Sequence, residues 1–491
     1  ERARGDKRNL QIFDATAIHA LELLAASLHG MLTSSANRWF SLRYKESTLN
    51  STDEAKEWLE DATDKMYVAF ARSNFQQEVF EAYHDLIAFG TACLMIEEDE
   101  NDILRFSSRH IKELYIQENE RGFVDTIYRR FKIPVSAAVE KFGAENLSKE
   151  TNKLFLKEPF EKIELVHVVR PRTVYNELKQ DKRNMPFQSI YFEFGSGHII
   201  NIGGFKELPY VIPRYLKAST EIYGRSPAMN ALPDVKVLNK MVETGLKAAA
   251  KQVDPPLLVP DDSMISPIRM SPGSLNYYRS GSRDRIEPLN IGQATSATLN
   301  QENQRREAIA KIFHIDQLMI TQSRSMTATE VLQRNEEKMR ILGPVLGRLQ
   351  QELLQPMILR VFNIMLRNKL FREAPGILAN QEIDIEYVSP MALAQRSQEL
   401  QSLIRGLELF GQIGQIAPVQ DYIDENGLIK QIISLLGLPA KMIRSDNQVA
   451  ELRQQRAAAQ AEQQQMMQAM QEAKVAKDAA PMLRELNRGT E

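Results

Sequence analysis

The sequence predicts an α+β protein that is mainly helical and contains more than one packed region. Helical periodicity fills the stretch before Gly90 and most of the chain after Pro227, whereas β-branched and aromatic runs dominate between Gly90 and Leu216. The 491 residues also exceed the size at which a single hydrophobic core stops growing, roughly 250 to 300 residues. We therefore expect several cores in one chain.

The composition is that of a protein that folds in water. Hydrophobic residues make up 43% and charged residues 26% of the chain. No segment has the ~18 to 20 consecutive apolar residues of a membrane-spanning helix, and Glu1–Asp6 lead into no signal-peptide pattern. The formal net charge is −2, whereas a protein that grips nucleic acid usually carries a basic excess. We expect no membrane partner, and only loose contact with DNA if the protein meets it.

The N-terminal region is predicted to be helical. Asp14 can cap a first amphipathic helix and Gly30 can end it. Two further tracts of good helix formers run from about Asp53 to Ser73 and from about Phe75 to Phe89.

An antiparallel sheet is predicted next. Its strand-like runs include Phe123–Tyr128, Ile163–Val169 and Ser189–Phe194, and one helix is expected near Pro134–Phe142. The glycine-rich segment Gly195–Gly204 lacks the spacing of a nucleotide-binding loop, so it is interpreted as a strand-ending turn.

A helix, a compact module and a returning helix are predicted after the sheet. Pro227 is well placed near the start of a long helix to about Val253, which Asp254 and two prolines stop. The following Pro/Gly/Ser-rich stretch contains short strand-like pieces, and a helix resumes from about Ala294 to Phe313.

A very long helical tract is predicted from Thr327, and Pro344 and Pro356 should kink it without ending it. Its apolar stripe comprises Leu342, Val345, Leu346, Leu349, Leu353, Met357, Val361 and Met365. A short strand is expected at Ile383–Val388. The Gln/Ala-rich segment Gln454–Lys477 favours a helix that needs neighbouring copies for stability.

Residues suited to catalysis are scarce, so no catalytic residue, metal site or cofactor is predicted. The single cysteine, Cys93, lies in an apolar run and is interpreted as a buried, inert thiol. No HExxH spacing and no Walker motif occurs. The acidic run Glu97–Asp102 could bind a hard cation, but a solvated loop is favoured. Asp384 and Glu386 share a strand face as metal-binding carboxylates can, but no third carboxylate lies nearby.

Four segments, in order along the chain, carry a family resemblance. They are Ala15–Leu28 with Leu32–Ser35 and Arg38–Leu42, then Glu221–Met229 with Leu232–Lys236 and Leu238–Asn239, then Thr327–Val331, and last Tyr387–Pro390 with Ala394–Arg396. In this order they resemble the head-to-tail connecting, or portal, family of short-tailed double-stranded DNA bacteriophages.

The resemblance implies a portal-type fold and a ring of about twelve subunits. It implies a wing (1–225), a first stem helix (226–253), a clip (254–293), a second stem helix (294–313) and a channel loop (314–326). A long kinked helix and wing return (327–395) and a crown with a C-terminal helical barrel segment (396–491) would follow.

The same resemblance implies the contacts. The residues of the channel loop expected to face DNA are Gln317, Thr321, Gln322, Ser323, Arg324 and Ser325. In the clip, Arg279, Arg283 and Arg285 are expected to dock a partner or phosphate, although a merely solvated loop is equally compatible with them.

The function implied is a structural portal in the virion, assembled in the host cytoplasm, with no enzymatic activity. Double-stranded DNA would pass through its channel during packaging and ejection. The terminase large subunit, then tail adaptor and tail proteins, and also capsid and scaffolding proteins, would be its partners. The alternatives are a different phage ring such as a tail adaptor, which should be shorter, and a DNA-processing enzyme, which should carry a Walker motif or a carboxylate cluster.

Overall fold

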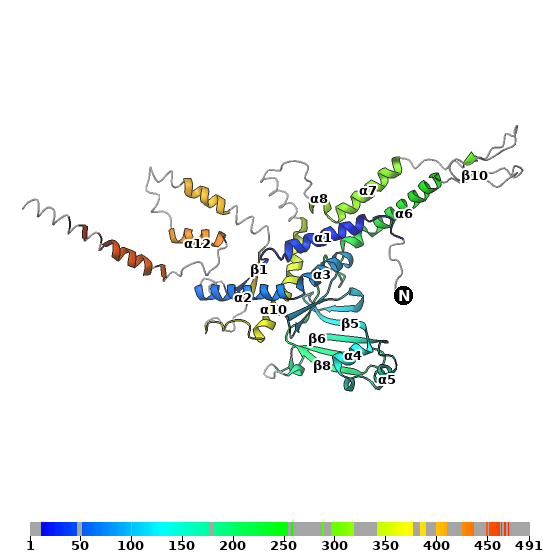
Figure 1. Cartoon of the computed structure of the whole chain (residues 1–491), viewed down its shortest axis with the longest axis horizontal. Coiled ribbons are helices and arrows are strands. Elements are labelled where there is room, and N and C mark those ends of the chain that lie inside the picture. Colours follow the sequence, from blue (N-terminus) through cyan, green and yellow to red (C-terminus); the bar gives the residue numbers. More distant parts are fainter. Residues whose placement is uncertain are drawn as a thin grey trace, which may run out of the picture. The chain divides into compact units, whose positions relative to one another are not determined.

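The fold is an α+β arrangement of many helices and several antiparallel sheets, seen in a computed structural model (Figure 1). The structure describes residues 11–46, 52–99, 101–176, 181–253, 257–258, 287–288, 296–318, 341–376, 383–388, 399–409, 425–436, 448–449, 451–461, 463, 466–467 and 470. It divides into two compact units, which confirms the expectation of more than one packed region. The first comprises Glu1–Phe40, Lys65–Leu370 and Tyr387–Ala392, and the second Ser41–Asp64, Phe371–Glu386 and Leu393–Glu491.

The first helix, α1 (Thr16–Leu32), begins as predicted but ends later. Asp14 Oδ1 accepts a hydrogen bond from the Thr16 amide at 2.9 Å. The prediction that Gly30 ends the helix is wrong. The helix continues because Leu32 extends the buried row that contains Leu24 and Leu28, at intervals of four residues.

The next two helices, α2 (Asp53–Arg72) and α3 (Phe75–Phe89), confirm the predicted tracts. Helix α3 ends at Gly90, whose φ of 78° places it in the left-handed region that glycine tolerates. The Gly90 amide donates to the Leu86 carbonyl at 2.8 Å.

The predicted antiparallel sheet is confirmed and has five strands in the order β4-β5-β6-β7-β8. The strands are β4 (Leu114–Glu118), β5 (Val124–Pro134), β6 (Lys162–Pro171), β7 (Phe187–Glu193) and β8 (Ile199–Phe205). Gly195 and Gly197 lie in the turn between β7 and β8, as the strand-ending interpretation required, but that interpretation is wrong for Gly203 and Gly204, which lie within β8.

Two helices lie between β5 and β6, and only one was predicted. Helix α4 (Val135–Phe142) matches the expectation, while α5 (Lys149–Lys157) was missed. Ser148 caps α5 by accepting the Thr151 amide at 3.2 Å, so the missed signal was a serine N-cap before a short helix.

A smaller sheet has the order β3-β2-β9, from β3 (Ile103–Ser108), β2 (Leu94–Asp99) and β9 (Tyr210–Val211). The prediction of a loop at Glu97–Asp102 is wrong for Glu97–Asp99, which end strand β2 and pair with β3. It holds for Asn101 and Asp102, which lie in the turn before β3, where Asp99 Oδ1 accepts the Asn101 amide at 2.8 Å. Cys93 is fully buried in the adjoining core, and burial raises the pKa of its thiol to about 12. This confirms that the thiol is buried.

One histidine is part of the core of the large sheet. The His167 ring is buried, with Nδ1 2.7 Å from the Tyr210 hydroxyl and Nε2 2.9 Å from Ser189 Oγ. It also stacks on Tyr191 with ring centroids 3.8 Å apart. Burial lowers the pKa of His167 well below its ordinary value, so this histidine is a neutral structural group.

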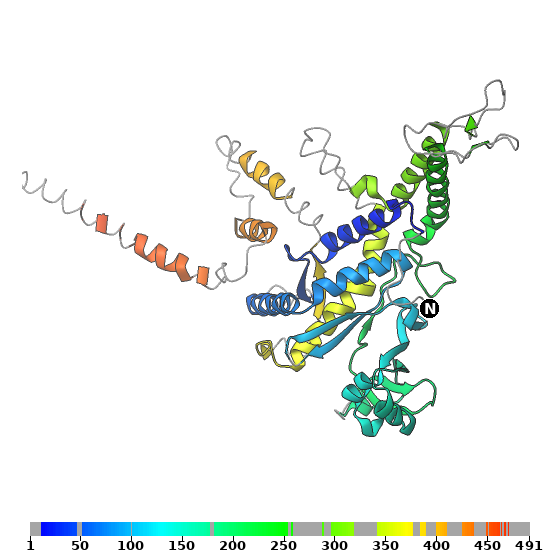
Figure 2. The ribbon, with the colours of Figure 1, turned by 45° about the vertical axis from the view of Figure 1, so that its right-hand side comes forward.

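The predicted helix, module and returning helix follow. Helix α6 (Pro227–Val253) and helix α7 (Ser296–Ile312) lie side by side, and α1 packs against both near α8 (Ile315–Leu318) (Figures 1 and 2). Between α6 and α7, the short strands β10 (Leu257–Leu258) and β11 (Glu287–Pro288) pair antiparallel, as the strand-like pieces suggested.

The long helical tract is confirmed where the structure describes it. Residues 341–349 are helical, a π-helical turn (η5, Gln350–Leu354) follows, and α10 (Gln355–Arg367) continues the tract. All eight residues of the predicted apolar stripe are buried. The wide turn precedes Pro356, whose ring clashes with a regular α-helical turn and whose nitrogen donates no hydrogen bond.

The second unit contains the predicted strand β12 (Ile383–Tyr387), paired with β1 (Phe40–Tyr44). Asp384 accepts from Arg43 at 2.7 Å, so this carboxylate has an ion-pair role rather than that of a metal ligand. The unit also has α12 (Glu425–Leu436) and a helix at 451–461, which covers the described start of the Gln/Ala-rich segment and is mostly exposed.

Candidate functional site

The α6–α7 pair is held by contacts between its two helices and with α1. Asp234 on α6 pairs with Arg305 on α7 at 2.7 Å. A Cβ added to Gly245 of α6 would lie 3.6 Å from Glu302 of α7, which is an ordinary packing distance. Arg306 of α7 bonds Asp14, just before α1, at 3.0 Å.

Beyond the middle of α6, the helix is largely exposed. Leu246 is 56% and Val253 88% exposed, and the flanking lysines are also exposed. Glu243 accepts from Lys240 at 3.0 Å and from Lys247 at 2.5 Å on the same helix surface. This half of α6 presents apolar and basic side chains that no other described part of the chain covers.

The base of α6 is different, because it is fixed to α3 by a buried cap. Ser226 Oγ accepts the Met229 amide at 2.9 Å, which makes Ser226 the N-cap, and Pro227 occupies the first helical position. The same hydroxyl donates to the Ala88 carbonyl at 3.0 Å. One buried side chain therefore begins α6 and bonds it to the end of α3.

Two glycines make the closest approach at this base. A Cβ on Gly224 would lie 2.0 Å from the Gly90 carbonyl oxygen, and a Cβ on Gly90 would lie 2.3 Å from the Gly224 carbonyl oxygen. The Gly224 amide also donates to Thr91 Oγ1 at 2.8 Å. Only glycine at both positions lets these two backbones touch.

Tyr223 completes the contact with the large sheet. Its hydroxyl donates to the Leu114 carbonyl at 3.2 Å and accepts the Ile116 amide at 3.3 Å, both on β4. The run Tyr223–Pro227, which helped to carry the family resemblance, is thus the joint between α6, α3 and β4.

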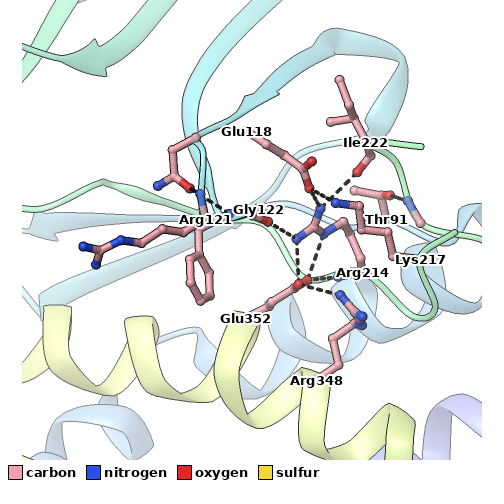
Figure 3. Close-up of polar contacts among 12 residues, drawn as sticks. Thr91, Glu118, Arg121, Gly122, Arg214, Lys217, Ile222, Arg348 and Glu352 are labelled. Atoms are coloured by element: carbon pink, nitrogen blue, oxygen red, sulfur yellow. Dashed lines mark hydrogen bonds and ion pairs between the residues drawn. The ribbon is translucent and has the colours of Figure 1, made fainter. Parts of the chain in front are cut away.

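A buried arginine lies beside this joint (Figure 3). The Arg214 side chain is 2% exposed and binds Glu352 through two nitrogens, Nε at 3.0 Å and Nη2 at 2.7 Å. It also pairs with Glu118 and donates to the carbonyls of Ile222 at 3.1 Å and Gly122 at 3.0 Å. We call this set the Arg214 centre.

Two further cations complete the Arg214 centre. Lys217 binds Glu118 at 2.5 Å, and Arg348 binds Glu352 at 3.0 Å. The centre therefore links the end of β4, the segment before α6 and the π-helical turn that contains Glu352. These three segments are far apart in sequence and become one rigid support for α6.

The electrostatics of the centre favour its charged state. Desolvation alone would lower the pKa of Arg214, but the hydrogen bonds and charges of Glu352 and Glu118 outweigh it and raise that pKa. Desolvation alone would raise the pKa of Glu118, but Lys217 and Arg214 outweigh it and lower that pKa. The pairing compensates for burial.

A second buried arginine fixes α10 to the small sheet. Arg360 is 4% exposed and donates to the Ile96 carbonyl at 3.0 Å and the Glu207 carbonyl at 3.1 Å. Desolvation lowers the pKa of Arg360 to about 10 despite the nearby Glu207 carboxylate. Arg367 bonds the same carboxylate at 2.7 Å.

Comparison with known proteins relates this architecture to phage connectors. A family described as bacteriophage head to tail connecting protein matches residues 1–443. The portal protein of Salmonella phage epsilon15 is 32% identical over 465 residues, which is 92% of this chain and 84% of that protein. The chain therefore belongs to the bacteriophage head-to-tail connecting protein family. This confirms the resemblance drawn from the four segments.

Two more relatives share this family's portal description. The probable portal protein of Bordetella phage BPP-1 is 32% identical over 472 residues, covering 93% of this chain and 84% of that protein. The portal protein of Enterobacteria phage T3 is 22% identical over 414 residues, with coverages of 80% and 72%. Head-to-tail connecting proteins are structural, non-enzymatic virion components, and the family implies an oligomeric ring that links head and tail.

Most of the predicted contact residues of this head-tail connector lie outside the described part of the chain. Gln317 lies in α8. The others, outside the described residues, are Thr321, Gln322, Ser323, Arg324 and Ser325 of the predicted channel loop and Arg279, Arg283 and Arg285 of the predicted clip.

The Arg214 centre was not predicted, because Arg214 is 96 residues from Glu118 and 138 residues from Glu352 in the sequence. Among the described residues no three His, Cys, Asp or Glu side chains group as metal ligands, and no described helix is long and apolar enough to cross a membrane.

Proposed function

We infer that copies of this chain assemble into a closed ring of about twelve subunits around a channel for double-stranded DNA. The DNA would enter the head through this channel during packaging and leave through it on ejection. The ring would dock the terminase large subunit first and tail adaptor and tail proteins later, and would contact capsid and scaffolding proteins at its vertex.

The observation that carries this proposal is the α6–α7 pair on its rigid base. Two helices that lie side by side can pack against the same pair in a neighbouring copy, while the module between the helices meets a docking partner. In this proposal α6 and α7 are the stem, residues 254–293 the clip, 314–326 the channel loop and 396–491 the crown.

An apolar stripe on α6 supports packing between copies. Leu232, Val235, Val242, Leu246 and Val253 fit the alternating three- and four-residue spacing of a helix–helix seam. Leu232 and Leu246 are 47% and 56% exposed, so the described residues of the chain do not fill this seam. A neighbouring copy would cover it.

The experiment is a measurement of native mass and of rotational symmetry in negative-stain images of the full chain. A closed ring with a central hole supports the proposal, and a stable monomer or dimer across salt and concentration overturns it. Leu246→Asp should weaken the ring, whereas Leu156→Asp, at an 83% exposed leucine on α5, serves as the matched control and should leave the mass unchanged.

A further inference from the structure

Helix α6 carries a row of lysines on the side away from α7. Successive residues of an α-helix are about 100° apart, so Lys236, Lys240, Lys247 and Lys251 fall within about 60° of one another. Asp234 and Gly245, which contact α7, lie on the opposite side of the helix. We call these four lysines the lysine face.

The lysine face is accessible and only partly neutralised. The Lys240 and Lys247 side chains are 73% and 69% exposed, and both bind Glu243. Lys236 and Lys251 are exposed as well, and neither has a carboxylate partner among the described residues. The face thus keeps a positive charge on a chain whose overall formal charge is −2.

The shape of this face suits a long polyanion. From Lys236 to Lys251 the helix rises about 22 Å, and duplex DNA carries one negative charge per ~1.7 Å of its axis. Lysine ammonium groups are mobile point charges on flexible stems, and they do not impose the planar two-point binding of arginine. Glu243 reduces the attraction further, so each copy would hold DNA weakly and let it slide.

We propose that the lysine face of α6 is the surface at which the assembled ring meets duplex DNA. This inference rests on the proposed ring and channel, and it places α6 on the channel side of α7. It adds a helical contact to the loop contacts expected from the sequence. An acidic surface on a neighbouring copy is the competing occupant.

The first test measures binding of a short blunt-ended DNA duplex to assembled rings of the full chain over a range of salt. The test variant carries Lys236→Gln, Lys240→Gln, Lys247→Gln and Lys251→Gln, and the matched control carries Lys149→Gln, Lys153→Gln, Lys157→Gln and Lys162→Gln around α5. We expect the test variant to bind about tenfold more weakly at low salt with a shallower salt dependence, because it makes fewer phosphate contacts. The control should bind like the parent.

The second test asks what the lysine face touches in the ring. Lys240→Cys should react with a maleimide in empty rings and become protected when the duplex is added, and the native Cys93 is buried and adds little background. Lys153→Cys should react equally in both states.

Three outcomes overturn the inference. The test variant could form intact rings that bind the duplex as the parent does. Lys240→Cys could be unreactive in empty rings, or the glutamine variant could fail to form rings while its control succeeds; either result would assign the face to a neighbouring copy. If the parent itself forms no ring, it is the proposed function that fails.

Discussion

The two halves of α6 differ in how much of their surface the other described residues bury and bond. At the base, Ser226, Gly224 and Leu238 are buried, and the adjoining Arg214 donates to two carboxylates and two carbonyls. In the outer half, Leu246 is 56% exposed and the lysines form ion pairs only along the surface of the helix. The same helix is thus anchored at one end and largely exposed, among the described residues, at the other.

This difference separates two roles. Removing one partner of a buried ion pair strongly destabilises the fold, so a buried pair holds its two side chains in one geometry. An exposed ion pair contributes little to stability, and its side chains can bind other partners instead. The base therefore sets the direction of α6, and the outer half remains available for contacts in an assembly. Equivalent substitutions in the two halves should give unequal results.

The largest effect is expected at the Arg214 centre. Arg214→Met should lower the free energy of opening around residues 210–230 by about 3–5 kcal/mol, because Glu118 and Glu352 would stay buried without their partner. Native-state hydrogen exchange of peptides from this segment gives that free energy. Arg225→Met removes an exposed ion pair with Glu221 and should change the exchange little. Equal effects of the two variants would show that the centre does not hold the base.

A leucine truncation should distinguish the halves almost as clearly. Leu238→Ala removes a side chain that is 1% exposed and should lower the free energy of opening by about 2–5 kcal/mol, since it leaves a cavity. Leu246→Ala should change it by less than about 0.5 kcal/mol in the unassembled chain. Thermal unfolding and hydrogen exchange at low protein concentration measure both. If Leu246→Ala is as damaging as Leu238→Ala, the outer half is buried within the chain.

Glycine substitutions should have opposite signs in the two halves. Gly224→Ala places a Cβ 2.0 Å from the Gly90 carbonyl oxygen and should destabilise the base by about 1–3 kcal/mol through overpacking. Gly245→Ala has room at 3.6 Å and should stabilise the helix by up to about 1 kcal/mol, because alanine favours helix more than glycine does. The unfolding midpoints of the two variants should shift in opposite directions, and a shift in the same direction would contradict the assigned packing.

The sequence predicted local structure well because that structure depends on neighbouring residues. The helical stripe from Leu342 to Met365, the strands of the large sheet and the bounds of α3 all follow periodicity or capping. Where it failed, tertiary packing decided the outcome, as when burial of Leu32 carried α1 past Gly30.

The candidate site was less predictable for the same reason. The Arg214 centre joins residues from three distant segments, and no spacing in the sequence predicts that these residues are in contact. The lysine face was visible as four lysines at helical intervals, but only the Asp234 and Gly245 contacts show which side of α6 is turned from α7.

The smallest expected effect is a loss of stability in acid, and it compares Glu118 at the base of α6 with Glu243 in the outer half. The pKa of Glu118 is lowered because Lys217 and Arg214 outweigh desolvation, and the pKa of Glu243 is lowered by Lys247 and Lys240. A carboxylate with a lowered pKa in the folded state stabilises the fold above its unfolded pKa, and that contribution is lost as the pH falls through the folded value. Wild-type stability should therefore decline below about pH 4.5, and the contribution of Glu118 to this decline should be at most ~1.4 kcal/mol per pH unit.

Salt should separate the two carboxylates. Glu118→Gln should flatten the acid decline both at low salt and in 1 M salt, because its partner Arg214 is buried and poorly screened. Glu243→Gln should have a detectable effect at low salt only, since its lysine partners are exposed. Unfolding midpoints between pH 3 and 6 at the two salt concentrations measure this. If salt abolished the Glu118 effect as well, the pair at the base would behave as a surface pair, and the contrast between the two halves of α6 would not extend to their electrostatics.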